Sequence, residues 1–253
     1  MAEDARDLAE LYVNTMKVHP EGYALYLPQP FSILKPGSCG YLDKDRQWNP
    51  IVDLTKPSAI SKAGYEPIET LQRGPTGRPT WKPKPSRYVT SSSFAIDANI
   101  SADQLGLPVG CTTAFKYHSS RDFGAILLCE AEVLEERYFH ESPFRKWLKT
   151  NLETILKKVE DVREHGVYIV TKTFSTNKCS INVWTEKSNE VIIGVGAKVP
   201  SVAGADVSGG WSRGHSSSSW RSWVRKPLPS FQFIIDVQLG RREARRVLHW
   251  HIR

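Results

Sequence analysis

Long segments in which apolar and polar residues alternate are the main feature of this chain. Phe231–Leu239 alternates at every position but one, because Ile234 stands on its otherwise polar side. Since successive side chains of a β-strand point to opposite faces, this period predicts a strand with one buried face. The same pattern extends over Thr90–Ile100, Phe123–Val133 and Val167–Phe174 with its continuation towards Thr185. We expect Val167–Phe174 and Lys178–Thr185 to form a hairpin around Ser175-Thr176-Asn177.

Two segments have the apolar period of amphipathic helices. Ala5–Lys17 carries acidic residues in its first turn, and Pro143–Arg163 opens with proline after Ser142, an arrangement favoured at helix starts. The remaining segments are short strands at Phe31–Leu34 and Gly40–Val52, and irregular chain over 55–87 and 199–219. Together these elements predict an α+β fold, with a long-stranded, mostly antiparallel, twisted sheet and several helices.

Basic residues outnumber acidic ones and gather in two places. Lys and Arg number 34 against 27 Asp and Glu, for a net charge of +7. The predicted helix and the segment 240–253 carry the clusters, which are Arg145, Lys146, Lys149, Lys157 and Lys158 in the helix and Arg241, Arg242, Arg245 and Arg246 near the end. Such clusters attract nucleic acids or anionic lipid headgroups, and charge alone does not choose between them. A solvated surface is the third interpretation.

The start of the chain and its cysteines predict a cytosolic protein. Met1–Asp7 is acidic where a secretory signal has basic and then apolar residues, and no apolar run reaches the ~18 residues of a membrane helix. The cysteines lie far apart, at Cys39, Cys111, Cys129 and Cys179. We therefore expect four reduced thiols and no metal site.

One short motif matches a catalytic pattern. Gly210-Trp211-Ser212-Arg213-Gly214 fits G-x-S-x-G, which exposes a nucleophilic serine where a strand turns into a helix. The Gly- and Ser-rich surroundings predict neither element, so we expect no enzyme and no cofactor, and a serine hydrolase using Ser212 remains an alternative. Trp211, Trp220 and Trp223 alternate with basic residues, a pattern typical of base stacking, of a membrane interface or of hairpin packing. A basic nucleic-acid-binding module is therefore a second alternative.

Five segments keep the order and spacing of a known family. They are Phe31-Ser32-Ile33-Leu34-Lys35-Pro36-Gly37, Ser92-Ser93-Phe94-Ala95-Ile96-Asp97-Ala98-Asn99, Ser142-Pro143-Phe144-Arg145-Lys146, Gly166-Val167-Tyr168-Ile169-Val170-Thr171-Lys172-Thr173 and Phe231-Gln232-Phe233. In this order they resemble the pore-forming N-terminal domain of the gasdermin family, most closely its fungal allorecognition members. The resemblance implies one pore-forming domain over 1–239, with hairpin regions at about 88–134 and 167–239 and a basic tail at 240–253.

The resemblance also implies a function. Such a protein binds acidic phospholipids, oligomerises, and converts its hairpin regions into a transmembrane β-barrel that lyses the cell, moving from the cytoplasm to the plasma membrane. No nucleic acid is then expected as a partner, and Arg145, Lys146, Lys149, Lys157 and Lys158 become the lipid-binding candidates. The membrane-inserting candidates are apolar residues of the predicted strands, namely Phe94, Ile96, Ala98, Ile126, Leu128, Val167, Ile169, Phe233, Ile235 and Val237.

Two departures from animal gasdermins bear on activation. The first helix is acidic where animal members carry basic residues, and we expect no C-terminal repressor domain after the tail. The resemblance therefore implies activation by contact with a variant of the same protein, in mixed oligomers, rather than by proteolysis. Arg241, Arg242, Arg245 and Arg246 are the partner-contact candidates. A silent variant that only triggers its partner is a further alternative.

Overall fold

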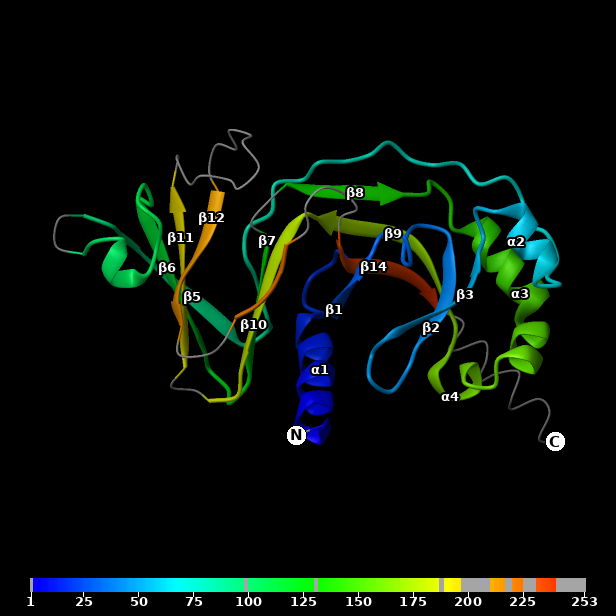
Figure 1. The fold of residues 1–253 in the computed structure, drawn as a ribbon, viewed down its shortest axis with the longest axis horizontal. Coiled ribbons are helices and arrows are strands. Elements are labelled where there is room, and N and C mark those ends of the chain that lie inside the picture. Colours follow the sequence, from blue (N-terminus) through cyan, green and yellow to red (C-terminus); the bar gives the residue numbers. More distant parts are fainter. Residues whose placement is uncertain are drawn as a thin grey trace.

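The molecule is elongated, with sheets at one end and most of its helices at the other (Figure 1). The computed structural model describes residues 2–97, 100–129, 132–186, 189–196, 210–216, 220–224 and 231–239. Its helices are α1 (Ala2–Met16), α2 (Pro57–Lys62), α3 (Ser142–Lys158) and α4 (Val162–His165), with a 3-10 turn η1 (Asp103–Leu105). Helix α1 stands in the middle, while α2, α3 and α4 lie together at one end (Figure 1).

A six-stranded sheet occupies the centre of the molecule. Its strands are β1 (Tyr23–Pro30), β2 (Ser38–Leu42), β3 (Trp48–Asp53), β8 (Val133–Arg137), β9 (Tyr168–Thr176) and β14 (Phe231–Leu239). They run in the order β1-β14-β9-β2-β3, and β8 pairs with β9 beyond the end of β2. Helix α3 packs on this sheet because Phe144, Trp147 and Leu148 share a buried cluster with Ile169 of β9. All pairings of this sheet are antiparallel.

Two four-stranded sheets form the other end. The first, called the proximal sheet, has the order β13 (Trp220–Val224), β10 (Lys178–Trp184), β7 (Gly124–Cys129) and β4 (Lys84–Pro85). The second, called the distal sheet, has the order β12 (Gly210–Ser216), β11 (Glu190–Gly196), β6 (Thr113–Ser119) and β5 (Val89–Ala95). Their facing side chains form one buried cluster that includes Tyr117 of β6, Leu128 of β7 and Trp184 of β10. The two sheets therefore pack as a sandwich.

A strap over residues 66–83 connects the helical end to the sandwich. It runs along the free edge of β8 (Figure 1), where Gly77 and Glu135 exchange backbone hydrogen bonds of 2.9 and 2.8 Å. At its start, the carbonyl oxygen of Glu66 accepts a 2.7 Å hydrogen bond from the indole of Trp147. The strap thereby covers an edge that could otherwise pair with another chain.

The predicted α+β class with mostly antiparallel strands is confirmed. Strand β14 has the bounds that the alternation of Phe231–Leu239 predicted, and the helix predicted at 143–163 is α3 followed by α4. The predicted strand Gly40–Val52 is a hairpin of β2 and β3 around its polar tip. Part of the irregular 55–87 segment is ordered as α2 and β4.

The hairpin predicted around Ser175-Thr176-Asn177 is wrong. β9 belongs to the central sheet and β10 to the proximal sheet, so the chain passes from one sheet into the other. A two-residue hairpin turn needs left-handed backbone, which glycine or asparagine supplies. Arg46 is the only non-glycine residue with a positive φ in the described part of the chain. Asn177 therefore does not form the turn.

Two other predictions are also wrong. The chain turns at Phe31–Leu34 instead of forming a strand, because the carbonyl oxygen of Pro30 accepts hydrogen bonds from the amides of Ile33 and Leu34 (2.9 and 3.0 Å). Gly210–Ser216, expected within a loop at 199–219, is strand β12. Its Gly214 leaves room for the turn at Leu105, whose carbonyl oxygen would lie 2.7 Å from an added Cβ atom.

Candidate functional site

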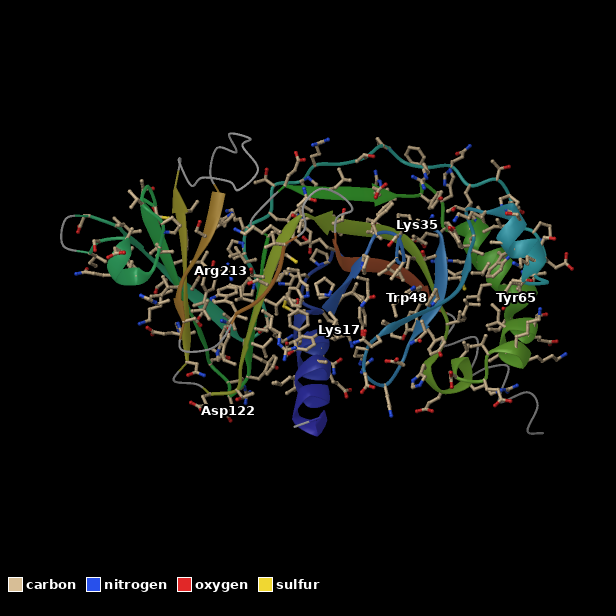
Figure 2. The ribbon with its side chains drawn as sticks, in the orientation of Figure 1. Lys17, Lys35, Trp48, Tyr65, Asp122 and Arg213 are labelled. Atoms are coloured by element: carbon tan, nitrogen blue, oxygen red, sulfur yellow. The ribbon has the colours of Figure 1, made fainter. Side chains whose placement is uncertain are left out.

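The proximal and distal sheets are two halves of one sheet folded on itself. The chain runs from β4 into β5, from β6 into β7, from β10 into β11 and from β12 into β13. Both sheets keep these strands in the same order, with β6 beside β11 and β7 beside β10 at the centre. Asp122 marks the bend between β6 and β7, at the lower edge of the sandwich in Figure 2. Each strand of one half therefore continues into its counterpart in the other.

The two central strands keep a single register through the fold. In the proximal sheet the last pair is Gly124↔Trp184, and in the distal sheet the next is His118↔Glu190. Five residues separate these pairs on each strand, 119–123 on one and 185–189 on the other. Because the two bends have equal length, straightening both would join the halves into one ladder without moving any pair.

The buried faces of this folded sheet are apolar. The inner faces meet in a cluster that contains Tyr117, Ile126, Leu128, Trp184 and Val191. The outer face of the proximal sheet packs against α1, and the outer face of the distal sheet packs beneath η1 and the chain that follows it. Each Å² of apolar surface that these faces bury stabilises the folded form by about 25 cal/mol.

The candidate membrane-inserting residues occupy three different clusters. Ile126 and Leu128 lie between the sheets, Phe94 and Ile96 lie against Leu107 on the distal outer face, and Val167 and Ile169 face α3. Phe233, Ile235 and Val237 lie on β14 of the central sheet. Ala98 lies outside the described residues, as do the tail candidates Arg241, Arg242, Arg245 and Arg246. The structure therefore keeps these residues apart and does not assemble them.

The five candidate lipid-binding residues share the exposed side of α3, opposite its buried face. Arg145 pairs with Glu141 (2.8 Å), Lys146 pairs with Glu69 (3.1 Å), and Lys158 donates to the carbonyl oxygen of Ala63 (2.5 Å). Lys149 and Lys157 are exposed as well. A hollow of about 380 Å³ lies between α3 and the strap, lined by Lys146, Lys149 and Glu69. An anionic headgroup could enter it beside the two ammonium groups.

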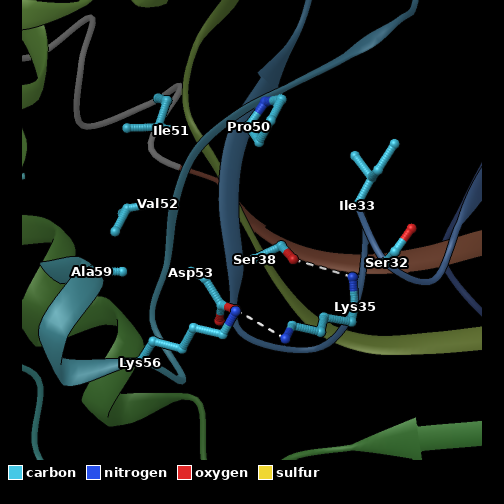
Figure 3. A pocket seen from close by; sticks show the side chains of 10 residues that line it. All are labelled: Ser32, Ile33, Lys35, Ser38, Pro50, Ile51, Val52, Asp53, Lys56 and Ala59. Carbon is cyan, nitrogen blue, oxygen red and sulfur yellow. Dashed lines mark hydrogen bonds and ion pairs between the residues drawn. The ribbon is translucent and has the colours of Figure 1, made fainter.

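A second basic pocket was not predicted from the sequence. Lys35, Lys56, Ser32 and Ser38 line a hollow of about 460 Å³, and Figure 3 shows both lysines reaching Asp53. The Asp53 carboxylate lies 2.9 Å from Lys35 and 3.6 Å from Lys56. Burial alone would raise the pKa of Asp53, but hydrogen bonds from Thr55 and Lys35 outweigh it and hold that pKa below its ordinary value. The single negative charge of Asp53 therefore offsets one of the two positive charges of Lys35 and Lys56.

The motif around Ser212 does not have the surroundings of a nucleophile elbow. Ser212 lies in the middle of β12, paired with Gly194 of β11, and is buried. A nucleophile elbow needs a sharp turn from strand to helix, whereas β12 continues as a strand on both sides of Ser212. In the described ranges no three His, Cys, Asp or Glu side chains gather as a metal site would require. Over those ranges, none of the helices combines the length and the apolar content needed to cross a membrane.

Comparisons with known proteins give a structural likeness but no match in sequence. No family model matches the chain, and no curated protein matches it. Among solved structures, the chain is similar to the gasdermin A3 membrane pore determined by cryo-EM, with 11% identity over 93% of this chain and 88% of that chain. The TM-score is 0.27, so the two structures superpose loosely. The gasdermin family remains a prediction from the sequence.

Proposed function

We propose that this chain is a pore-forming protein that binds acidic membranes, oligomerises and opens its folded sheet into membrane-spanning hairpins, causing lytic cell death. The observation that carries the proposal is the single register of the central strands through both bends. A refolding that breaks every hydrogen bond of a sheet is costly, since each buried unpaired group costs about 1–3 kcal/mol. Here the central ladder can persist while only the bends straighten.

The straightened strands have ample length for a bilayer. Residues 113–129 and 179–195 would each extend roughly 55 Å at about 3.3 Å per residue. A tilted strand crosses the hydrocarbon core with about 9–11 residues. One half of the sheet could therefore span the membrane while the other half stays with the body of the protein.

The exposed basic side of α3 supports binding to an acidic surface. Each Lys or Arg near an anionic membrane contributes about 1 kcal/mol. The trigger, as the family resemblance suggests, is contact with a variant of the same protein, through the arginines at 241–246 and the acidic first helix. Proteolytic release of a repressor has no place in this proposal.

The test is dye release from vesicles of phosphatidylcholine alone and of phosphatidylcholine mixed with phosphatidylserine, with the protein alone and with its nearest variant. We expect release only from the anionic vesicles, and mainly when both proteins are present. Binding without release indicates a lipid-docking module. If the protein neither binds nor permeabilises anionic vesicles, the proposal is wrong, and salt-sensitive oligonucleotide binding becomes the next experiment.

A pair of charge variants tests the role of α3. Lys149→Glu with Lys157→Glu removes two exposed positive charges from α3, whereas Lys44→Glu with Lys82→Glu makes the same change in net charge elsewhere on the exposed surface. At about 1 kcal/mol each, two lost charges weaken vesicle binding at least ~30-fold. Equal weakening by both double variants would show that only net charge matters.

A further inference from the structure

The distal sheet is apolar on both faces. Phe115 and Tyr117 of β6 pack inwards against the proximal sheet, together with Val191 and Ile193 of β11. Phe94 of β5 packs on the opposite, outer face, as does Ile96 just beyond the strand. A sheet that contacts lipid on one side and water or protein on the other needs its apolar residues on one face. In its present register the distal sheet does not have that property.

The cause is a jump in register between β4 and β5. At β4 the amide of Ser86 donates to the carbonyl oxygen of Ala125 (2.8 Å), continuing the pair Pro85↔Ile126. Two residues later, the carbonyl oxygen of Tyr88 accepts from the amide of Ser120 (2.9 Å). Between these two bonds the outer strand advances two residues, from Ser86 to Tyr88, while the neighbouring strand covers five, from Ala125 to Ser120. The three extra residues lie in the bend of the neighbouring strand between Ser120 and Ala125, while the outer strand turns at Ser86, whose carbonyl oxygen accepts from the amide of Val89 (3.0 Å).

Continuing the register of β4 through β5 would merge the two apolar faces. Phe94, now opposite Ala114, would lie opposite Tyr117, and Ile96 would lie opposite Phe115. A shift by an odd number of residues carries side chains to the other face of their neighbours. The merged face would present Phe94, Ile96, Phe115, Tyr117, Val191, Ile193 and Trp211. Ser93, Lys116 and His118 would share the opposite face with Ile192, which pairs with Lys116.

We propose that β5 slips three residues along β6 when the protein enters a membrane, and that the merged apolar face contacts the lipid acyl chains. This inference rests on the proposed function and adds which side of the sheet meets lipid. The slip moves β5 by roughly 10 Å at about 3.3 Å per residue.

Helix α1 holds the jump in place. The carbonyl oxygen of Thr15, in the last turn of α1, accepts a 3.2 Å hydrogen bond from the amide of Arg87. Just beyond α1, the ring Nε2–H of His19 donates to the carbonyl oxygen of Pro85 (2.8 Å). These two contacts flank Ser86, where the register changes. Because the Ser86 amide points to β7, the neighbouring Arg87 amide points away from β7, and its bond to Thr15 together with the bond from His19 to Pro85 holds residues 85–87 against α1.

Two cysteine pairs that share one position distinguish the registers. Thr90 and His118 are directly opposite now, with Thr90 Oγ1 and His118 Nε2 3.0 Å apart, and both are exposed. Ser93 is exposed too and would lie opposite His118 only after the slip. Directly opposed strand positions fall in the Cα separation that a disulfide requires, whereas positions three residues out of register do not. Thermal unfolding of both reduced variants verifies that they fold.

We expect the disulfide of Thr90→Cys/His118→Cys to form in solution, to preserve binding to anionic vesicles and to lower dye release at least tenfold, with full recovery on reduction. The pair Ser93→Cys/His118→Cys should cross-link only in vesicles that have been permeabilised, and should leave release unchanged. Full release by the oxidised Thr90–His118 variant, or no Ser93–His118 cross-link in permeabilised vesicles, overturns the slip. A wild-type chain that releases no dye under any trigger overturns the proposed function and the slip with it.

Discussion

Replacing Tyr12 by phenylalanine should stabilise the packing of α1 against the proximal sheet. Tyr12 is 0% exposed and packs with Tyr26, at 5.5 Å between ring centroids, beneath the proximal sheet. Its hydroxyl is buried and has no hydrogen-bond partner within the described ranges. Burial, with the neighbouring thiols of Cys179 and Cys129 adding to it, raises the pKa of Tyr12 well above its ordinary value. The phenol therefore stays neutral and unpaired in an apolar site.

The magnitude follows from the cost of an unpaired buried hydroxyl, about 1–3 kcal/mol. Phenylalanine keeps the ring and removes the hydroxyl, so we expect Tyr12→Phe to raise the free energy of unfolding by about 1 kcal/mol or more. A chain of this size should then melt roughly 2–4 °C higher for each kcal/mol. If displacement of α1 limits pore formation, the rate of dye release should fall about fivefold for each kcal/mol.

Urea unfolding measures the stability, and vesicle dye release measures the rate. Tyr26→Phe is the matched control, because Tyr26 contacts the same ring but its hydroxyl is not buried without a partner. We expect that control to change stability by less than about 0.5 kcal/mol. A Tyr12→Phe variant that is less stable than the wild type would refute the reasoning, since it would show that the hydroxyl makes a stabilising contact.

Three further predictions concern other parts of the fold. Burial lowers the pKa of His19 below its ordinary value near 6.5. The folded state should therefore lose stability as the pH falls from 7 towards that lowered pKa, by at most ~1.4 kcal/mol per pH unit. In urea unfolding, the stability of His19→Gln should lack this dependence on pH. Gly124→Ala should destabilise by about 1–3 kcal/mol in thermal unfolding, because the added Cβ would lie 2.1 Å from the Trp184 ring. Ser212→Ala should leave dye release unchanged, and loss of an esterase activity present in the wild type would favour the hydrolase alternative.

Regular patterns predicted the elements better than composition did. The alternation of Phe231–Leu239, interrupted only by Ile234, and the apolar period of α3 predicted both elements, and in α3 that period forms one buried side. Tyr23–Pro30 was missed as a strand since its two prolines and lack of alternation conceal it. Gly210–Ser216 was missed because its glycines indicate a loop, although Gly214 allows close packing against Leu105 and Leu107.

The fold of the sheet on itself could not be predicted from local patterns. It depends on β7 pairing with β10, strands separated by α3 and α4 in sequence, and on the equal length of two bends. The alternation that marked Phe94, Ile126 and Ile169 as membrane-inserting candidates does not tell which element covers each of them, and the structure places them in three separate clusters. The basic residues of α3 were accessible to prediction, since charge on the exposed side of an amphipathic helix follows from its period alone.

The equal length of the two bends also constrains how this sequence can change. One residue deleted from 119–123 alone would shift the pairs of β6 with β11 by one position and turn their side chains to the opposite face. A deletion of one residue from 185–189 at the same time would restore every pair. In diverging descendants of this chain, insertions and deletions in the two bends should therefore arise in matched pairs, although some sixty residues of sequence lie between them.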